Sequence, residues 1–314
     1  MRRRSSCLRV GLSVCLLLAG SGMALEALPP LIVSGERTGP GLWQVRGAHS
    51  RLWILGTVSP LPVGMTWRAG EVTQVLGGVN SVVFAKPVEV SVPRVMWMLI
   101  ARSDLLLLPG GKKLRDVLPP ELYARFAALR AQSGESPDQW ERYRPIIAGA
   151  LLEDHALARV GLSNRLDVAL TVRRLAREKH LESVELQTPG APDLLASLRA
   201  LRPAAERTCL TSLLDTVESG LPALAARADA WASGDIERFT ALPPSTVTAC
   251  SSAMSAEGAA MTPWQQTQNA WLTALEARLQ GVGATLAVVD LDMLLGTGGL
   301  LQELSDFGYQ VEAP

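Results

Sequence analysis

The stretch LWILGTVSP, residues 52–60, is the strongest β-pattern in the sequence and decides the fold. Its first four residues form a continuous apolar run, which is typical of a strand that is buried on both faces. Gly56 and Pro60 end the run, because glycine permits unusual backbone angles and proline cannot continue a β-ladder. Thr57 and Ser59 add hydroxyl groups at the same point. Ligands of open α/β sheets bind at the carboxyl ends of the strands, so the stretch predicts a central strand that leads to a site.

Strand and helix patterns on both sides of this stretch indicate the rest of the sheet. The predicted strands are residues 42–46, 51–55, 80–86, 182–186, 284–291 and 309–312. The predicted helices between them are residues 67–76, 164–180, 265–280 and 300–307. Strands that alternate with helices form βαβ units, whose strands are parallel. The sequence therefore predicts an α/β fold with a mixed, largely parallel sheet that is built from both ends of the chain.

The middle of the chain is helical by pattern, over residues 92–231, and we expect it to form a large insertion into the α/β fold. Residues 232–261 have a weaker pattern, with Pro243-Pro244 and a stretch rich in serine and alanine, and are expected to form a loop. Because the sheet draws on both chain ends, we expect a single domain over residues 25–314.

The first 24 residues differ in kind from the rest. Four arginines precede an apolar run at residues 10–18, and small residues surround Ala24. This pattern is typical of a secretory signal peptide that is cut after Ala24. Lipoprotein processing at Cys15 is disfavoured, because Cys15 lies inside the apolar run. The sequence thus predicts a periplasmic or secreted protein, and no other stretch has the roughly 18 unbroken apolar residues of a membrane span.

The charge balance bears on the kind of partner. The chain has 30 basic and 30 acidic residues, and loss of the four arginines of the signal peptide would leave a modest acidic excess. No basic stripe is present, which argues against nucleic acid as the partner. The expected partner is an unidentified protein or small-molecule ligand.

Two cysteines remain after the signal peptide, Cys209 and Cys250. In an oxidising compartment two cysteines most simply form one disulfide bond, which would link the helical middle of the chain. The alternative is a reactive thiol. It has no support in the sequence, since no histidine lies within ten residues of either cysteine.

Asp290 and Asp292 follow the predicted strand at 284–291 and allow two interpretations. On a continuing strand both carboxylates would face one side, about 7 Å apart, and could bind a hard cation or act as acid and base. If the strand ends earlier, both would cap a turn or the following helix, which is the favoured interpretation.

The Gly-rich run at 296–299 could cradle a phosphate, but without Walker or dinucleotide spacing a simple turn is favoured. The zinc motif HExxH, paired CxxC motifs and the GxSxG motif are absent from the sequence.

Four segments together resemble the bacterial TraB/GumN family. They are LWILGTVSP at 52–60, VVFAKP at 82–87, the pair Gln268-Asn269, and VVDLDMLLGTGGLLQELSDFGYQV at 288–311. The resemblance implies a fold akin to erythromycin esterase-like and haem-binding ChaN-like proteins. It also implies kinship with proposed metal-dependent proteases related to the Tiki enzymes. The residues that match the family scaffold are Gly56, Thr57, Asn269, Gly296, Gly299, Gly308 and Tyr309.

The chain departs from the family pattern at the positions of the implied metal site. Ser59 stands where the family has a histidine, and Ala85 where it has a glutamate. Gln268 replaces an arginine, and Met293 replaces a second histidine. A hydroxyl, a methyl and a thioether group do not hold Zn²⁺ tightly. The resemblance, read with these departures, therefore implies a family member that has lost the usual metal chemistry.

The sequence predicts a secreted or periplasmic pseudoenzyme that works as a binding or accessory module without a cofactor. One alternative is a metal-dependent hydrolase or protease with relocated acidic ligands, Asp290 and Asp292, which together with Ser59 would favour weakly held Mg²⁺ or Ca²⁺. A second alternative, by fold analogy alone, is a small-molecule or haem binder. The candidate binding residues are Gly56, Thr57, Ser59, Asn269, Asp290 and Asp292.

Overall fold

The structure is a computed structural model that describes residues 39–86, 105–138, 140–166, 168–188, 200–256 and 262–314. These residues belong to one compact unit, Arg37–Pro314. The expected signal peptide lies outside the described residues, as do residues 92–104 and 189–199 of the expected helical insertion.

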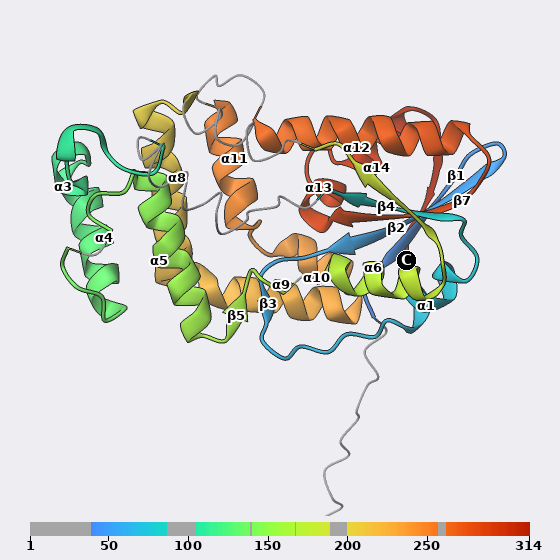
Figure 1. The fold of residues 1–314 in the computed structure, drawn as a ribbon, viewed down its shortest axis with the longest axis horizontal. Coiled ribbons are helices and arrows are strands. Elements are labelled where there is room, and N and C mark those ends of the chain that lie inside the picture. The colour runs from blue at the N-terminus through green and yellow to red at the C-terminus, as the bar shows by residue number, and fades with distance from the viewer. Residues whose placement is uncertain (1–38, 87–104, 139, 167, 189–199, 257–261) are drawn as a thin grey trace, which may run out of the picture. The chain divides into compact units, whose positions relative to one another are not determined.

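A six-stranded sheet forms the centre of the described fold. Its strands are β1 (Leu42–Arg46), β2 (Ser50–Thr57), β4 (Ser81–Ala85), β6 (Glu182–Leu186), β7 (Gly283–Asp290) and β8 (Gln310–Glu312). They lie in the order β6-β4-β7-β2-β1-β8 (Figure 1). Strands β6, β4, β7 and β2 run parallel to one another, and β1 is antiparallel to both β2 and β8. The predicted mixed, largely parallel sheet from both ends of the chain is confirmed.

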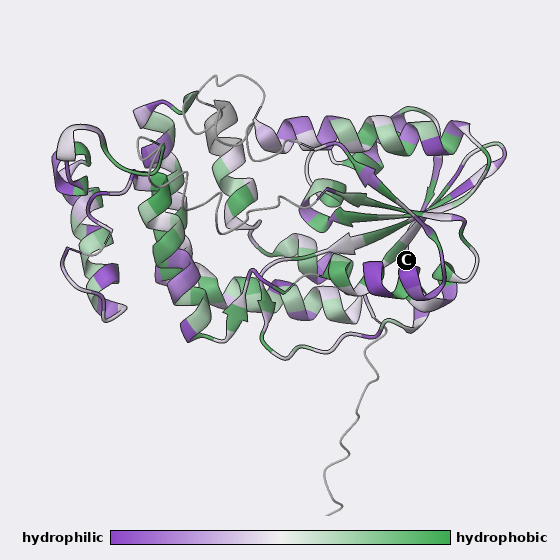
Figure 2. Cartoon of the chain, viewed as in Figure 1, coloured by the Kyte–Doolittle hydropathy of each residue, from purple (hydrophilic) through white to green (hydrophobic). Residues whose placement is uncertain are grey.

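Strand β2 pairs with β7 over its whole length, from Ser50 opposite Gly283 to Thr57 opposite Asp290. Leu52, Ile54 and Leu55 of β2 are buried. Since neighbouring residues of a strand point to opposite faces, this run is covered on both sides of the sheet. The hydropathy colouring shows the same apolar centre at the middle strands (Figure 2).

Helices cover the two faces of the sheet. Four of them are α1 (Gly70–Leu76), α6 (Val168–Glu178), α12 (Pro263–Gln280) and α14 (Leu300–Asp306). In Figure 1, α12 and α14 lie above the sheet, and α1 and α6 lie below it. Trp271 and Leu275 of α12 and Val172 of α6 belong to the same buried core as the strands. Because β2, β4 and β7 are parallel within this layer between the helices, their carboxyl ends lie at the same edge of the sheet.

The middle of the chain is helical, as predicted, and has its own apolar cluster. Its helices are α3 (Leu114–Val117), α4 (Pro120–Gln132), α5 (Pro145–Arg159), α8 (Pro203–Asp215) and α9 (Leu221–Ser233). Phe126, Leu152 and Leu210 are among the buried residues of this cluster. A π-helical turn, Thr216–Gly220, joins α8 to α9. Among the described residues, no helix is both long and apolar enough to cross a membrane.

The prediction of a loop over residues 232–261 is wrong, because most of the described part of this segment is helical. It contains α10 (Ile236–Ala241) and α11 (Thr246–Ala256). The side chain of Asp235 caps α10 by accepting a hydrogen bond from the backbone N–H of Arg238, at 2.9 Å. The predicted disulfide joins Cys250 of α11 to Cys209 of α8, whose Cα atoms are 4.7 Å apart. Contacts with remote segments therefore hold α11 in place, and the local sequence pattern does not reveal them.

Candidate functional site

The carboxyl ends of strands β2, β4 and β7 lie at one edge of the sheet. Thr57 at the end of β2 lies opposite Asp290 at the end of β7. Phe84 of β4 lies opposite Val288 of β7, so Ala85 reaches the same edge on the other side of β7. This edge therefore includes the position at which ligands bind in related sheet topologies.

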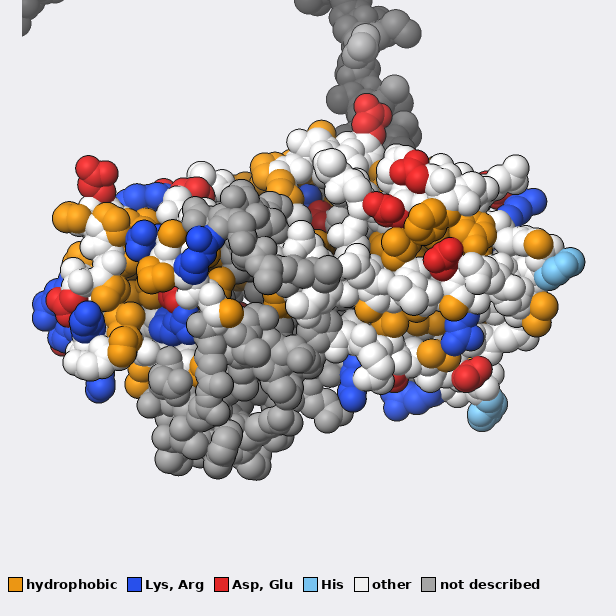
Figure 3. All heavy atoms as spheres, turned by 90° about the horizontal axis from the view of Figure 1, so that it is seen from above, with side chains coloured by type: hydrophobic (Ala, Val, Ile, Leu, Met, Phe, Trp, Pro, Cys, Tyr) orange, Lys and Arg blue, Asp and Glu red, His pale blue; other side chains and the backbone are white. Residues whose placement is uncertain are grey.

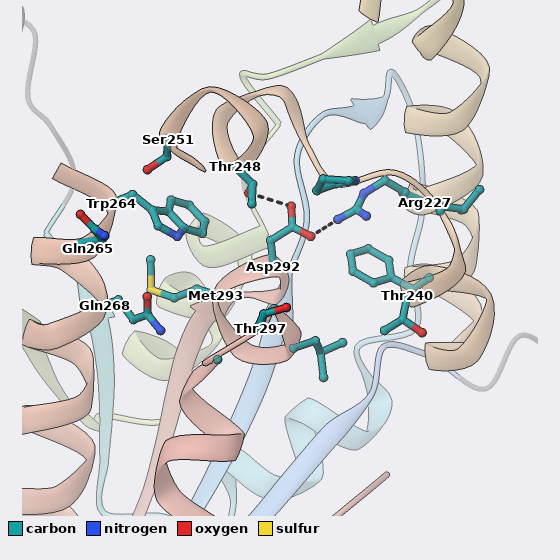
Figure 4. Close-up of a pocket in the computed structure, with 16 residues that line it drawn as sticks. Arg227, Thr240, Thr248, Ser251, Trp264, Gln265, Gln268, Asp292, Met293 and Thr297 are labelled. Carbon is teal, nitrogen blue, oxygen red and sulfur yellow. Dashed lines mark hydrogen bonds and ion pairs between the residues drawn. The ribbon is translucent and has the colours of Figure 1, made fainter. Parts of the chain in front are cut away.

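A cavity of about 670 Å³ lies beyond the end of β7 (Figure 4). Its wall comes from α9, α10, α11 and α12, from the short helix α13 (Leu291–Leu295), and from the glycine-rich loop at residues 296–299. The lining residues are Arg227, Phe239, Thr240, Leu242, Pro244, Thr248, Ser251, Trp264, Gln265, Gln268, Asp292, Met293, Leu295, Gly296, Thr297 and Gly299. Five of the residues singled out from the sequence thus line one cavity: Gln268, Asp292, Met293, Gly296 and Gly299.

Gly56 and Thr57 support the frame of the site and do not line the cavity. A Cβ atom at Gly56 would lie 2.5 Å from Cδ1 of Leu291, so glycine allows α13 to approach β2. The Gly56 carbonyl accepts a hydrogen bond from Nε1 of the buried Trp231, at 2.7 Å. The Thr57 hydroxyl donates to the carbonyl of Val289, at 3.2 Å, and so links β2 to β7.

Ser59 and Ala85 also lie outside the cavity wall. The hydroxyl of Ser59 donates to Oδ1 of Asn164, at 3.1 Å. Ala85 is exposed, and its carbonyl accepts a hydrogen bond from Nη2 of Arg173, at 2.9 Å. Asn269 is exposed on α12 and is not a lining residue. The structure therefore does not bring Ser59, Ala85 and Met293 into one cavity.

Asp290 is the N-cap of α13. Its carboxylate accepts hydrogen bonds from the backbone N–H groups of Asp292, at 2.9 Å, and Met293, at 3.4 Å. The favoured interpretation of Asp290 as a capping residue is confirmed. Desolvation and the nearby charge of Asp292 raise the pKa of Asp290 to about 7. A carboxyl group that titrates near neutral pH therefore lies directly behind the cavity wall.

Asp292 forms an ion pair with Arg227 of α9, and both side chains are buried (Figure 4). The second carboxylate oxygen of Asp292 accepts hydrogen bonds from the backbone N–H of Ser245 and the hydroxyl of Thr248, each at 3.1 Å. Asp292 thus caps the start of α11, a different helix from the one that the sequence suggests. Its carboxylate is already occupied by three donors.

Arg227 makes further contacts that hold it in place. Its Nη1 donates to the carbonyl of Pro243, at 3.0 Å, and its guanidinium carbon lies 3.9 Å from the centre of the Phe239 ring. The ion pair between Arg227 and Asp292 therefore ties α9, the segment before α11, and α13 to one another. These are three of the elements that form the cavity.

The wall from α12 is polar and aromatic. Oε1 of Gln265 accepts a hydrogen bond from the backbone N–H of Thr262, at 2.8 Å, in a capping box at the start of the helix. Nε2 of Gln268 donates to the carbonyl of Gly298, at 2.5 Å, and so fixes the glycine-rich loop. Trp264 is partly buried beside them.

The glycine-rich loop is a tight turn, as favoured from the sequence. The backbone N–H of Gly299 donates to the carbonyl of Gly296, at 2.7 Å, and that of Gly296 donates to the carbonyl of Asp292, at 3.0 Å. A Cβ atom at Gly299 would lie 2.5 Å from the carbonyl oxygen of Leu294. The loop uses glycine for close backbone approach, and its N–H groups at these two positions are bonded within the turn.

The residues of this region do not fit the metal site that the resemblance implies. Ser59 and Ala85 do not line the cavity that Met293 lines, and the carboxylate of Asp292 is held by Arg227. A buried arginine also disfavours a cation beside it. Within the described parts of the chain, no three histidine, cysteine, aspartate or glutamate side chains form a group that could hold a metal ion.

Sequence reasoning missed much of the cavity wall, including Arg227, Thr248, Trp264 and Gln265. The sequence contains one feature that points to Arg227. Arg227 lies in the alanine-rich helix LPALAARADAWAS, and a buried arginine needs a partner of opposite charge. The partner, Asp292, is 65 residues away in the sequence and could not be identified from spacing.

Comparison with known proteins gives one match, which covers nearly the whole described chain. No curated protein and no solved structure matches the sequence. The model of the TraB/PrgY/gumN family matches residues 41–313, which include β1, β8 and every element between them. The motifs that suggest the resemblance lie inside this range. The chain therefore belongs to the TraB/PrgY/GumN family.

Proposed function

We propose that this protein is an exported, non-catalytic binding module that holds a small ligand in the cavity beyond β7. The observation that carries the proposal is that both oxygens of the Asp292 carboxylate are engaged, one by Arg227 and the other by Ser245 and Thr248. A carboxylate that acts as a metal ligand or a general base needs an oxygen that is free to bind the metal or the proton.

The energetics of the ion pair support this proposal. Releasing Asp292 to bind a metal would leave the charge of Arg227 buried without its partner, and breaking such a pair costs roughly 3–5 kcal/mol. Asp290 is occupied in a similar way, because its carboxylate caps α13. The two acidic residues of the alternative hydrolase are therefore both used to hold the fold together.

The cavity itself is suited to binding. Its volume of about 670 Å³ is within the usual range for small-molecule sites, roughly 300–1,000 Å³. Apolar and aromatic side chains alternate with amide and hydroxyl groups along its wall. Such a combination gives a ligand both a surface to pack against and groups that fix its orientation.

Metal analysis tests the non-catalytic part of the proposal. Protein without residues 1–24 would be dialysed against Zn²⁺, Mn²⁺ or Mg²⁺, desalted and measured by inductively coupled plasma mass spectrometry. We expect well under one equivalent of each metal, and no difference between wild type and Asp292→Asn. Asp306→Asn, at an exposed position on α14, is the matched control. One equivalent of metal that disappears in Asp290→Asn or Asp292→Asn would instead support the hydrolase alternative.

Export is the second part of the proposal and rests on two features. Residues 1–24 have the pattern of a signal peptide, and Cys209 and Cys250 form a disulfide bond. Disulfide bonds persist mainly in oxidising compartments, so the pairing supports a periplasmic or secreted location.

A further inference from the structure

We propose that the cavity beyond β7 binds an uncharged saccharide ring, held mainly by the first turns of α12. This inference rests on the proposed binding function and assigns a ligand class to the same cavity. It is carried by three properties of the wall: its charge balance, the hydrogen-bonding groups that remain unused, and the position of one indole ring.

The cavity presents no net charge to a ligand. Of the described residues that line it, Arg227 and Asp292 are the charged ones, and they form an ion pair with each other. A charged ligand would have to compete with this pair inside a partly desolvated site, which is costly. The other polar lining groups are neutral amides and hydroxyls, and these favour a ligand that is polar and uncharged.

Two amide groups on α12 offer complementary unused atoms. The oxygen of Gln265 is used in the capping box, so its Nε2 group remains as a donor without a partner among the described residues. The nitrogen of Gln268 is used by the carbonyl of Gly298, so its Oε1 remains as an acceptor. The two residues are three positions apart on one helix and therefore lie on the same face.

A donor beside an acceptor matches the hydroxyl groups of a sugar. Each hydroxyl both donates and accepts a hydrogen bond, so two neighbouring hydroxyls can bond to Gln265 Nε2 and Gln268 Oε1 together. Thr297 lies across the cavity from α12 and brings a further hydroxyl group (Figure 4). A ligand without such groups would leave these amide atoms unpaired, at a cost in binding.

Trp264 supplies an apolar surface next to the two amides. Its indole is partly buried and lies between Gln265 and Met293 in the close-up (Figure 4). The C–H face of a sugar ring can pack on an indole while its hydroxyls reach the neighbouring polar groups. Met293 and Leu295 extend the apolar part of the wall. In this proposal Met293, which replaces a family histidine, is a packing residue for the ligand.

The test is saturation-transfer difference NMR on the purified mature protein with two separate panels of probes. One panel contains glucose, galactose, N-acetylglucosamine and their β-linked disaccharides. The other contains uncharged capped dipeptides. Dissociation constants of any binder are then measured by isothermal titration calorimetry.

Three variants test whether a bound saccharide contacts α12 in this cavity. Gln265→Glu keeps the oxygen that caps α12 but removes the amide donor, and Gln268→Lys keeps a donor for Gly298 but removes the acceptor. Gln266→Glu is the matched control, since Gln266 is exposed on the same helix and does not line the cavity. Melting curves establish that all three remain folded.

We expect at least one saccharide to bind to wild type. Loss of one neutral hydrogen bond should weaken its binding by roughly five- to tenfold in Gln265→Glu and in Gln268→Lys, and leave it unchanged in Gln266→Glu. Saccharide binding that is equal in all variants would overturn the assignment to this site. Binding of the dipeptides alone, with the same dependence on Gln265, would overturn the saccharide assignment but would support the proposed binding function. Cleavage of any probe would overturn the non-catalytic function, and no binding in either panel would overturn the saccharide assignment.

Discussion

Asp290 combines a capping role with a strongly perturbed acid–base equilibrium. Its carboxylate caps α13, while desolvation and the charge of Asp292 raise its pKa to about 7. In the unfolded chain an aspartate has a pKa of about 3.9. The folded state therefore binds this proton more tightly than the unfolded state. The resulting contribution to stability is complete below about pH 4 and is lost as the pH rises through about 7.

Asp290→Asn tests this linkage. Asparagine is also a good N-cap and keeps an oxygen for the two backbone N–H groups, but it carries no charge. We expect the variant to be more stable than wild type by about 1–3 kcal/mol at pH 8, and close to wild type at pH 4. Urea unfolding at pH 4, 6 and 8 measures the difference. A stability change that does not vary with pH would show that the pKa of Asp290 is not raised by folding.

The pair of Arg227 and Asp292 provides a second test at the scale of single residues. Because both groups are buried, Arg227→Met should destabilise the protein by about 3–5 kcal/mol. In the double variant Arg227→Met/Asp292→Leu no charge is left unpaired, so much of this loss should be recovered. A double-mutant cycle by urea unfolding gives the coupling energy.

The exposed pair of Arg46 and Glu312 is the control for this cycle, with both side chains about half exposed. Its coupling energy should be below about 1 kcal/mol. Equal coupling in the two cycles would mean that burial does not strengthen the interaction of Arg227 with Asp292.

At the scale of elements, the six strands of the central sheet follow from the sequence, whereas helices α10 and α11 do not. Apolar runs at residues 52–55 and 284–289 predict β2 and β7, because burial on both faces leaves a clear local pattern. Helices α10 and α11 are missed, since α11 is rich in serine, threonine and alanine and has no apolar stripe. Its start is capped by Asp292 and its middle is linked to α8 through Cys250. Both contacts connect residues more than 40 positions apart.

The same reasoning explains which parts of the site could be predicted. The sequence predicts the edge of the sheet at which the site lies. It also predicts Gln268, Asp292 and Met293 as residues of interest, because they lie directly after a strand or align with a family motif. Trp264, Gln265 and Arg227 join them only through the packing of α9 and α12 around α13. Ser59 was placed at the site by its family position, but its hydroxyl bonds to Asn164 outside the cavity.

The disulfide between α8 and α11 gives the prediction at this scale. It closes a loop with a sequence separation of 41 residues, so Cys209→Ala/Cys250→Ala should lower the free energy of unfolding by about 2–4 kcal/mol. Hydrogen exchange should also become faster in α11, while β2 and β7 stay protected. Thiol titration of the denatured, unreduced mature protein should find no free thiol, and two after reduction. Two thiols before reduction would contradict the bond.

At the scale of the whole molecule, export makes a specific prediction about the N-terminus. Expression of the full chain should yield a protein that begins at Leu25, because the proposed cleavage follows Ala24. N-terminal sequencing of the extracytoplasmic fraction measures this. A leader with Leu12→Arg and Leu16→Arg should leave the protein inside the cell, since it interrupts the apolar run. An N-terminus at Met1 in the extracytoplasmic fraction would contradict the assignment.

Figure 3 shows how charged side chains are distributed over one face of the molecule. On the face shown in Figure 3, basic and acidic side chains are interspersed. Binding to a phosphate backbone relies on clustered lysine and arginine, so this face offers no electrostatic footprint for it.

The position of β7 between β2 and β4 sets the order in which the polypeptide can acquire its structure. Strands β2 and β4 are made early in synthesis, yet each must wait for Gly283–Asp290 before it gains its neighbour at the centre of the sheet. A ribosome that has added 280 residues has therefore produced β1, β2, β4 and β6 without the strand that joins the pair β1-β2 to the pair β4-β6. Such dependence on distant contacts slows folding. On the proposed export route, the centre of the sheet stays open until Gly283–Asp290 has been synthesised, which keeps the chain unfolded enough to pass through a translocation channel.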